Sequence, residues 1–426
     1  MPATLIDCLA TTTQLSEIFS DRSVQQAMLD FEAALARSEA GAGLIPKKAA
    51  RLISAAAVAG GFDARELARL ALRAGTPAIP LVKMLTERVR LRSVAAAGFV
   101  HWGATSQDVT DTALVLLLGR CRRVFEADHH RLIRALRKLS NRHAKTVMLG
   151  RTLLQPAPPI TFGLKAAGWL ASIQRGWSSV VDTFDEADCL QFGGASGTLA
   201  ALGDRGLVMS TALAKELKLK CPDAPWHSHR DRLAAWMAAL GIYTASLGKM
   251  AIDIALLMQF EVGEVFEPGG DGRGGSSTMP HKRNPTACML TIAAAKRTPG
   301  LISNLLTGMV QEHERAVGGW QSEWTTVHGI VQATGVALES MTEVAEGLKV
   351  DAVRMRRNIE ATQGAVFAEK AMMLLAPKLG RAASHQAVEE HVKKSGSPPD
   401  LPGLRVPEDY LGSAEAFRLR LLKGKE

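Results

Sequence analysis

The chain has 426 residues, of which 47% are hydrophobic and 22% charged, and 51 Lys and Arg against 42 Asp and Glu give a formal net charge of +9. This balance excludes a disordered chain, which has less apolar content and more uncompensated charge. Aromatic residues make up only 5%, so the stacking side chains of a nucleic-acid binder are scarce, and the charge favours an anionic small-molecule substrate.

The five cysteines are odd in number, and no two of them are spaced as C-x-x-C. This usage argues against a disulfide framework and against a cysteine-based metal site. The first residues do not resemble a signal peptide, and no uninterrupted run of about 18 apolar residues indicates a membrane span. We therefore expect a cytoplasmic protein without a membrane segment.

Two long segments without proline show the period of a helix. Apolar residues recur at steps of three and four from Leu233 to Leu257, and a similar stripe runs from Leu114 to Leu139. Helices of this length need partners along their whole length, which predicts an all-α bundle of long helices shared between subunits. The predicted domains are an N-terminal helical domain (1–110), a central long-helix domain (111–350) and a small C-terminal helical domain (351–426).

Irregular segments are expected between the helices, at residues 74–82, 98–111 and 150–160. The glycine-rich segment 191–203 lacks the G-x-G-x-x-G order of a nucleotide site, so it favours a turn in which backbones approach closely. Residues 263–285 form the longest stretch without any period.

The histidines are weak candidates for metal ligands. His227 and His229 are two residues apart, and His129 and His130 are adjacent, so neither pair places two imidazoles on one helical face. The sequence also contains no H-E-x-x-H motif. We expect no metal.

Residues 274–285 give the strongest signal for chemistry. They combine two serines, a lysine and an asparagine with glycines and prolines, and the glycines before them suit a mobile loop. Asn284 and Pro285 are the residue types that cap and begin a helix. Lys282 is therefore expected at a helix N-terminus, where backbone N–H groups favour an anion.

The sequence GGSSTMPHKRNP in this segment resembles the signature of the fumarase/aspartase superfamily, G-S-S-x-M-P-x-K-x-N-P, and matches it at every fixed position. Residues 103–108 (GATSQD) and 150–157 (GRTLLQPA) are similar to the two other active-site regions of that family. The resemblance covers roughly residues 15–370. It implies an all-α fold, a homotetramer with a central bundle of long helices, and active sites assembled from three subunits.

The resemblance also implies chemistry at the carbon next to a carboxylate, where a proton is lost or gained. Ser276 would transfer the proton, with Ser277 as the neighbouring alternative, because a serine with a stabilised alkoxide can act as a base. Lys282 and Asn284 would stabilise charge that develops on the substrate. The residues implied to bind the substrate are His101, Thr105, Ser106, Gln155, Ser277, Met279 and Arg315.

Two departures from the family pattern select among its members. Lyases that expel an amine or hydroxide commonly have a histidine where this chain has Leu153. A carboxylate leaving group, with an ordinary pKa of about 4, needs no such acid. Adenylosuccinate lyases have a phosphate-binding serine and arginine where this chain has Trp320 and Trp324, five and nine residues after Arg315.

Both departures resemble the cycloisomerase branch of the superfamily. That branch implies a reaction in which one carboxylate of a muconate tricarboxylate adds across a double bond and closes a lactone, in the protocatechuate (β-ketoadipate) route of aromatic degradation. No cofactor is implied. The alternatives are an adenylosuccinate-type or other carboxylate-eliminating lyase, a cycloisomerase for a sulfo- or otherwise substituted muconate, a non-catalytic protein on the same fold, and a nucleic-acid binder.

Overall fold

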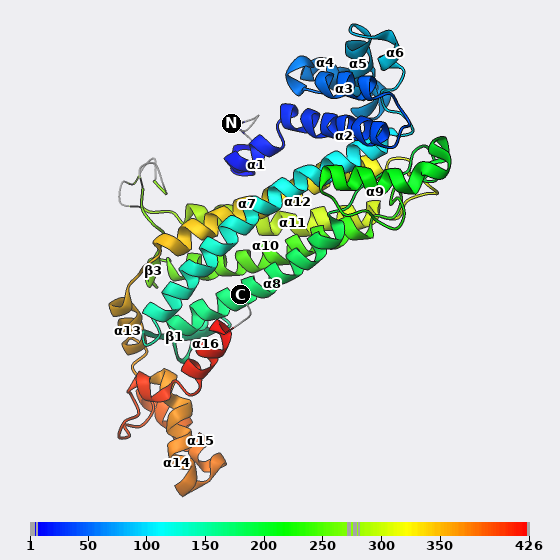
Figure 1. Ribbon diagram of the computed structural model, residues 1–426. Helices are drawn as coiled ribbons and strands as arrows, with labels where there is room; N and C mark the ends of the chain where they lie inside the picture. Colours follow the sequence, from blue (N-terminus) through cyan, green and yellow to red (C-terminus); the bar gives the residue numbers. More distant parts are fainter. Residues whose placement is uncertain (1–4, 6, 271–273, 276–278, 280–281, 424–426) are drawn as a thin grey trace. The chain divides into compact units, whose positions relative to one another are not determined.

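The computed structural model describes residue 5 and residues 7–270, 274–275, 279 and 282–423, and helices account for most of them (Figure 1). The apolar seam of α10 is buried from Leu233 to Leu257, and so is most of the stripe on α7, which confirms both predicted long helices. The long helices are α7 (Ser106–Arg142), α8 (Phe162–Ala187), α10 (Asp231–Leu257), α11 (Thr286–Gly308) and α12 (Gly319–Gly347).

The chain divides into two compact units. The first comprises Met1–Ala127, Ser178–Thr244 and Ala294–Val336, and the second comprises Asp128–Trp177, Ala245–Ala293 and Ala337–Glu426. Each long helix therefore contributes residues to both units. The division into three domains at residues 110 and 350 stays a prediction.

In the first unit, helix α2 packs against α3 and α9. Its buried side chains Met28, Phe31 and Leu35 belong to one apolar core, to which Leu81 and Leu213 also contribute. The shorter helices of this unit are α1 (Thr13–Ile18), α2 (Asp21–Gly41), α3 (Lys47–Ala56), α4 (Ala64–Ala74), α5 (Ala78–Arg90), α6 (Val94–Ala97) and α9 (Gly206–Leu217), with 3₁₀ turns at Asp7–Leu9, Ala59–Gly61 and Ala200–Arg205.

The break predicted at residues 74–82 is shorter in the structure. Helix α4 ends at Ala74, and Gly75 follows with φ +72°, a left-handed conformation that suits glycine. Helix α5 begins at Ala78 and includes Pro80 in its first turn. The prediction was wrong for 78–82, because a first-turn residue has no helical partner for its N–H and proline loses nothing there.

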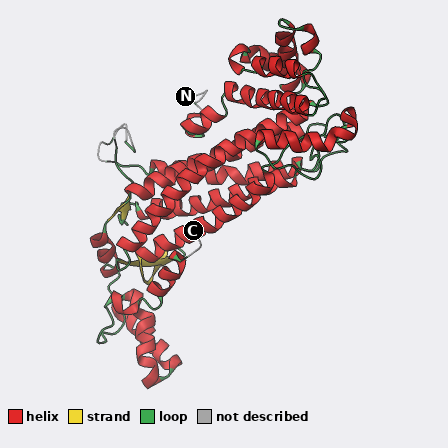
Figure 2. Cartoon of the chain, in the orientation of Figure 1, coloured by secondary structure: helices red, strands yellow, loops and turns green. Residues whose placement is uncertain are grey.

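The second unit contains two small antiparallel sheets besides its helices (Figure 2). Strand β1 pairs with β2 and packs against α13, while β3 pairs with β4, and α14 packs against α15. Val147, Leu149, Phe367, Val388 and Leu404 lie in the apolar core of this region. The elements are β1 (Val147–Thr152), β2 (Gln155–Thr161), β3 (Val265–Phe266), β4 (Lys349–Val350), α13 (Ala352–Glu360), α14 (Ala368–Leu379), α15 (Arg381–Ser395) and α16 (Ala414–Leu422), with 3₁₀ turns at Ala365–Phe367 and Pro407–Tyr410.

The β1–β2 hairpin corrects the prediction that residues 150–160 are irregular. The prolines of β2 suggested a loop, but a two-stranded sheet has open edges, and proline is tolerated on an edge strand. The turn between Thr152 and Gln155 consists of Leu153 and Leu154, with φ of +50° and +66°. Their side chains are 96% and 75% exposed, so two apolar residues stand at the tip of this hairpin.

Helix α11 begins at Thr286 and is capped by Glu267 rather than by Asn284 as predicted. The Glu267 carboxylate accepts hydrogen bonds from the backbone N–H groups of Ala287 (3.1 Å) and Cys288 (2.8 Å). The Asn284 side chain instead donates to the carbonyl of Gly275 at 3.4 Å. A carboxylate satisfies two free donors of the helix and complements its dipole better than an amide. The expected anion position at this N-terminus is therefore taken by the protein itself.

Helix α10 is long and apolar enough to cross a membrane by length and composition, although 56% of its most apolar window is buried within the protein. Core helices of soluble proteins share both properties. The sequence does not show this helix as an uninterrupted apolar run, because Thr244, Ser246 and Lys249 stand among its apolar residues.

Replacing the cap tests its contribution to stability. We expect Glu267→Ala to destabilise the protein by about 1–2 kcal/mol, because two helix N–H groups lose a charged acceptor in a buried place. The exposed Glu261 nearby is the matched control, and Glu261→Ala should leave the melting temperature unchanged. Thermal unfolding followed by circular dichroism measures both, and equal melting temperatures for the two variants would contradict the assignment of the cap.

Candidate active site

The N-terminus of α7 carries the first group of predicted site residues, Thr105 and Ser106. The carbonyl of Thr105 accepts the first helical hydrogen bond, and its N–H donates to the carboxylate of Asp108 at 3.0 Å. This return contact from the third helical residue is half of a capping box, so the sequence T-S-Q-D fixes locally where the helix starts. Both predicted residues lie in the first turn and are half-buried.

Asp108 also binds the glycine-rich segment to α7. Its carboxylate, fully buried, accepts hydrogen bonds from the N–H of Gly193 (3.0 Å) and of Gly194 (2.9 Å). The Nε2 atom of His227 lies 2.7 Å from Oδ1 of the same carboxylate. Three chain segments that are far apart in sequence therefore meet at one buried carboxylate.

Both glycines lie where neighbouring groups leave no room for a side chain. A Cβ on Gly193 would lie 2.7 Å from Pro225, and one on Gly194 would lie 2.9 Å from the carbonyl of Gly103. Gly194 also has φ +69°, where a side chain adds strain. The prediction of a tight turn in residues 191–203 is confirmed.

Arg230, directly before α10, is buried among carboxylates. Its guanidinium donates to Asp111 at 2.7 and 3.1 Å and to Glu323 at 2.7 and 3.0 Å. Burial alone would lower the pKa of Arg230, but these two carboxylates outweigh burial and raise it, so the group stays charged. The Nε1 atom of Trp320 donates to Asp111 at 2.9 Å, which joins α7 and α12 at the same point.

Arg315, a predicted substrate-binding residue, lies next to this cluster. Its Nε donates to the side-chain carbonyl of Gln107 at 3.0 Å, and its Nη2 donates to the backbone carbonyls of Gly194 (3.4 Å) and Ala195 (3.2 Å). The guanidinium is half-buried. All three acceptors are neutral, so the positive charge of Arg315 is available to an anion.

His101 occupies a left-handed backbone position, with φ +60°. Its Nδ1 lies 2.6 Å from a carboxylate oxygen of Glu32, whose side chain is fully buried, while the His101 side chain is 20% exposed. Burial alone would lower the pKa of His101, but the charges of Glu32 and Asp108 and the hydrogen bond to Glu32 outweigh it and raise the pKa. The Glu32 carboxylate thus favours the protonated form of the His101 imidazole.

The remaining predicted site residues belong to the second unit. Gln155 is exposed at the start of β2, and Met279 and Lys282 are also exposed, while Asn284 is half-buried. Ser276 and Ser277 lie outside the described residues. The first unit brings His101, Thr105, Ser106 and Arg315 to the N-terminal end of α7, and the other four described residues belong to the second unit.

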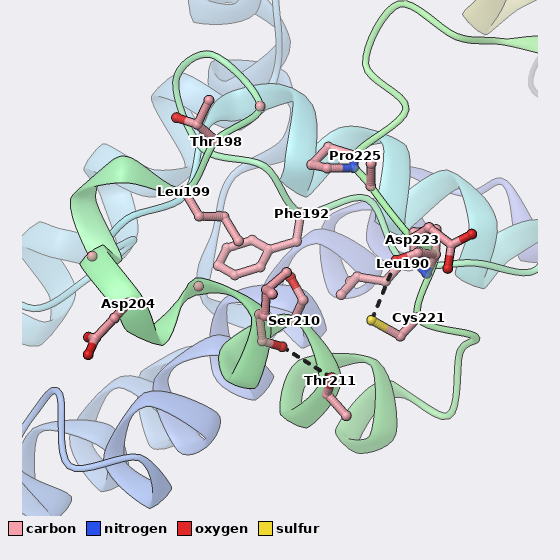
Figure 3. A pocket seen from close by; sticks show the side chains of 16 residues that line it. Leu190, Phe192, Thr198, Leu199, Asp204, Ser210, Thr211, Cys221, Asp223 and Pro225 are labelled. Carbon is pink, nitrogen blue, oxygen red and sulfur yellow. Dashed lines mark hydrogen bonds between the residues drawn. The ribbon is translucent and has the colours of Figure 1, made fainter.

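Two cavities differ in their relation to these residues. One, of about 520 Å³, lies in the first unit, where Figure 3 shows the Phe192 ring between Leu199 and Ser210. None of the described residues that line it belongs to the predicted site. The other, of about 590 Å³, lies in the second unit and is lined by Gln155 and Arg151, and Arg151 is paired with the buried Glu264 at 2.6 Å. We therefore place the site by its polar network rather than by the first cavity.

Sequence reasoning missed the residues that hold the site together. Gln107 and Asp108 belong to the segment 103–108 that resembles an active-site region, but no role was predicted for them or for Asp111, and Trp320 was predicted only to replace a phosphate contact. For the described residues, no group of three or more His, Cys, Asp or Glu side chains is arranged to hold a metal ion.

Comparison with known proteins gives consistent relatives. A family model described as Lyase matches residues 9–300. A curated relative from Bradyrhizobium diazoefficiens, named 3-carboxy-cis,cis-muconate cycloisomerase, is 45% identical over 95% of this chain and 94% of its own length. The crystal structure of the 3-carboxy-cis,cis-muconate lactonizing enzyme from Pseudomonas putida superposes with a TM-score of 0.92 and 44% identity over 98% of both chains.

A fumarate lyase from a Mesorhizobium species superposes with a TM-score of 0.87 and 35% identity over 98% of this chain and 99% of its own. The predicted fold class, a helical fold like that of the fumarase/aspartase superfamily, is confirmed.

Asp108 gives a direct test of how this part of the chain is held. We expect Asp108→Asn to destabilise the protein by about 3 kcal/mol, since an amide cannot accept all the hydrogen bonds that this buried carboxylate receives. The exposed Asp204 is the control, and Asp204→Asn should be neutral. Melting temperatures of the two variants decide the matter, and an unchanged value for Asp108→Asn would refute the assigned role.

Proposed function

The chain belongs to the lyase family, and on that premise we propose that it is an enzyme that interconverts 3-carboxy-cis,cis-muconate and 4-carboxymuconolactone. The observation that carries the proposal is the near-full-length likeness to proteins named for this reaction, at 44–45% identity over at least 95% of the chain. The residues that depart from the wider family pattern support the same choice.

Trp320 separates the proposed reaction from adenylosuccinate cleavage. Its ring is 3% exposed and its Nε1 is bound to Asp111, so the place of a phosphate-binding serine is filled by a packed indole. Trp324 packs edge-on against it, with ring centroids 5.0 Å apart. A nucleotide phosphate would find two indoles instead of a hydroxyl and a guanidinium.

Leu153 bears on the leaving group. It stands at the tip of the β1–β2 hairpin in place of the histidine that other lyases use, and its alkyl side chain cannot donate a proton. A carboxylate needs no proton to leave, because its ordinary pKa is about 4. The substitution therefore supports a carboxylate as the group that is added or expelled.

In the lactonizing direction, a carboxylate oxygen forms a bond to a carbon of the conjugated diene, and the π bond breaks. The adjacent carbon first acquires carbanion character, delocalised into a neighbouring carboxylate, and then takes up one proton. The trianionic substrate becomes a dianionic lactone, so each turnover consumes one proton and needs no redox partner. Fixed positive charge and donors lower the barrier by stabilising the dianionic carboxylate that develops.

We assign the roles as follows. Ser276 transfers the proton, with Ser277 as the alternative, and Lys282 and Asn284 stabilise the developing charge. His101 and Arg315 supply cations for substrate carboxylates, Thr105 and Ser106 supply donors, and Gln155 and Met279 contact the substrate. Two contacts support the roles proposed for the residues of the first unit. Arg315 has only neutral acceptors, and the imidazole of His101 is held by Glu32.

We further propose a cytoplasmic homotetramer whose active sites combine segments from three subunits. Exposed apolar side chains on the long helices, among them Ile252 and Leu256 on α10 and Met289 on α11, suit packing between copies.

The first test is turnover of 3-carboxy-cis,cis-muconate, generated in place from protocatechuate by a dioxygenase. We expect fast loss of the diene absorbance, a lactone product by NMR, and the uptake of one proton per turnover in a weakly buffered solution. Ser276→Ala should reduce kcat by at least 10³-fold with an unchanged oligomer, because the proton-transfer group is lost. Adenylosuccinate and 3-sulfomuconate serve as competitors. Faster turnover of either compound than of 3-carboxy-cis,cis-muconate, or an unchanged diene spectrum, would show that the proposed substrate is wrong.

The pH dependence of kcat/KM tests His101. Its raised pKa keeps the imidazole protonated to higher pH than a free histidine, so substrate binding should weaken as the pH rises through that pKa. Glu32→Gln removes the charge that raises the pKa, so this limb should move to lower pH. Burial, with the charge of Glu32, raises the pKa of Glu39 on the same helix to about 9, so Glu39→Gln changes no charge near neutral pH. A limb that moves equally in both variants, or in neither, would contradict the assignment.

A further inference from the structure

We propose that Gln107 is a positioning residue that holds the Arg315 guanidinium in its substrate-binding orientation while leaving its charge uncompensated. The inference rests on the proposed function and deepens it, because it assigns a role to a residue that does not itself contact the substrate. The observation behind it is a fully buried amide, each of whose polar atoms has a defined partner.

The orientation of the amide follows from its partners. The Nε2 atom of Gln107 donates to the Asp111 carboxylate at 3.2 Å and to the backbone carbonyl of His227 at 2.8 Å. Both partners are acceptors, so a reversed amide would place its oxygen against two oxygens in a buried place. The Gln107 carbonyl oxygen must therefore face Arg315 Nε, which it meets at 3.0 Å.

The partners of Gln107 are themselves fixed. Asp111 is held by two hydrogen bonds from Arg230 and one from Trp320, and all three side chains are buried. A displacement of the Gln107 amide would therefore have to break contacts with an ion cluster. Gln107 therefore connects Arg315 to this fixed cluster through its own side chain.

Arg230 and Arg315 differ in whether carboxylates neutralise their charge. Arg230 has two carboxylate partners, whereas no ion pair of Arg315 occurs in the part of the chain that the structure describes. A glutamate at 107 would neutralise Arg315, and its second oxygen would face the Asp111 carboxylate and the His227 carbonyl without a proton to donate. A neutral acceptor orients the guanidinium and preserves its attraction for a carboxylate, which explains why an amide serves at this position.

Gln191 offers a matched control in the same cluster. It is also fully buried, and its Nε2 donates to the same Asp111 oxygen at the same distance of 3.2 Å. Its carbonyl, however, accepts from the backbone N–H of Trp226 at 2.9 Å instead of from Arg315. The two glutamines thus differ mainly in whether they reach the arginine.

The experiment compares Gln107→Met with Gln191→Met by melting temperature and by steady-state kinetics with 3-carboxy-cis,cis-muconate. We expect similar losses of melting temperature, but a KM raised about 10- to 100-fold only in Gln107→Met. The shorter amide of Gln107→Asn cannot span the distance from Asp111 to Arg315, so it should also raise KM, and it serves if the methionine variant does not fold. In an Arg315→Met background, Gln107→Met should have no further effect on KM. Equal KM changes in the two glutamine variants, or additive effects with Arg315→Met, would overturn the proposal.

A substrate-independent measurement separates this inference from the proposed function. Isothermal titration with tricarballylate, a saturated tricarboxylate that cannot react, reports anion binding even if carboxymuconate is not turned over. Weaker binding in Gln107→Met but not in Gln191→Met supports the positioning role, whatever the true substrate. Equal binding in both variants, or no binding to the unmodified protein, refutes it.

Discussion

The buried guanidinium of Arg230, shared between Asp111 and Glu323, is the interaction on which the first unit depends. Removing a charge from water costs several kcal/mol, so each member of this cluster is tolerated only because the others are present. The cluster joins the start of α10 to α7 and α12, and Trp320, Gln107 and Gln191 also donate hydrogen bonds to Asp111. Moving one member would leave another buried charge without its partner, so the cluster holds the residues beside it in fixed positions.

Two sets of residues lie next to this cluster, namely Asp108 with its partners, and the site residues His101 and Arg315. Asp108, one turn before Asp111 on α7, gathers backbone N–H groups and His227 around a single carboxylate and so shapes the glycine-rich turn. The buried Glu32 carboxylate favours the protonated form of His101, and the guanidinium of Arg315 has only neutral partners. The first unit thus pairs the buried Arg230 with carboxylates, whereas the partly accessible Arg315 has neutral partners only.

Much of the fold could be predicted from periodicity, because α7 and α10 carry long apolar stripes that only helices can bury on one side. The β1–β2 hairpin could not, since its prolines resemble a loop and its pairing depends on packing against α13. The Glu267 cap was also out of reach, because a residue 19 positions before Thr286 supplies it through tertiary contact. For the site, the motif pointed to residues expected to touch the substrate, and only coordinates could reveal Gln107 and Asp111 behind them.

The hairpin tip has a consequence for how the chemistry of such a scaffold can change. Leu153 adopts φ +50°, a region in which histidine and asparagine are more at ease than leucine. The backbone at this corner is thus better suited to the proton-donating side chain of related lyases than to the one it carries. Passing from carboxylate addition to amine elimination would require no rebuilding of the loop. At this position of the fold, a single substitution of leucine by histidine separates the two reaction classes.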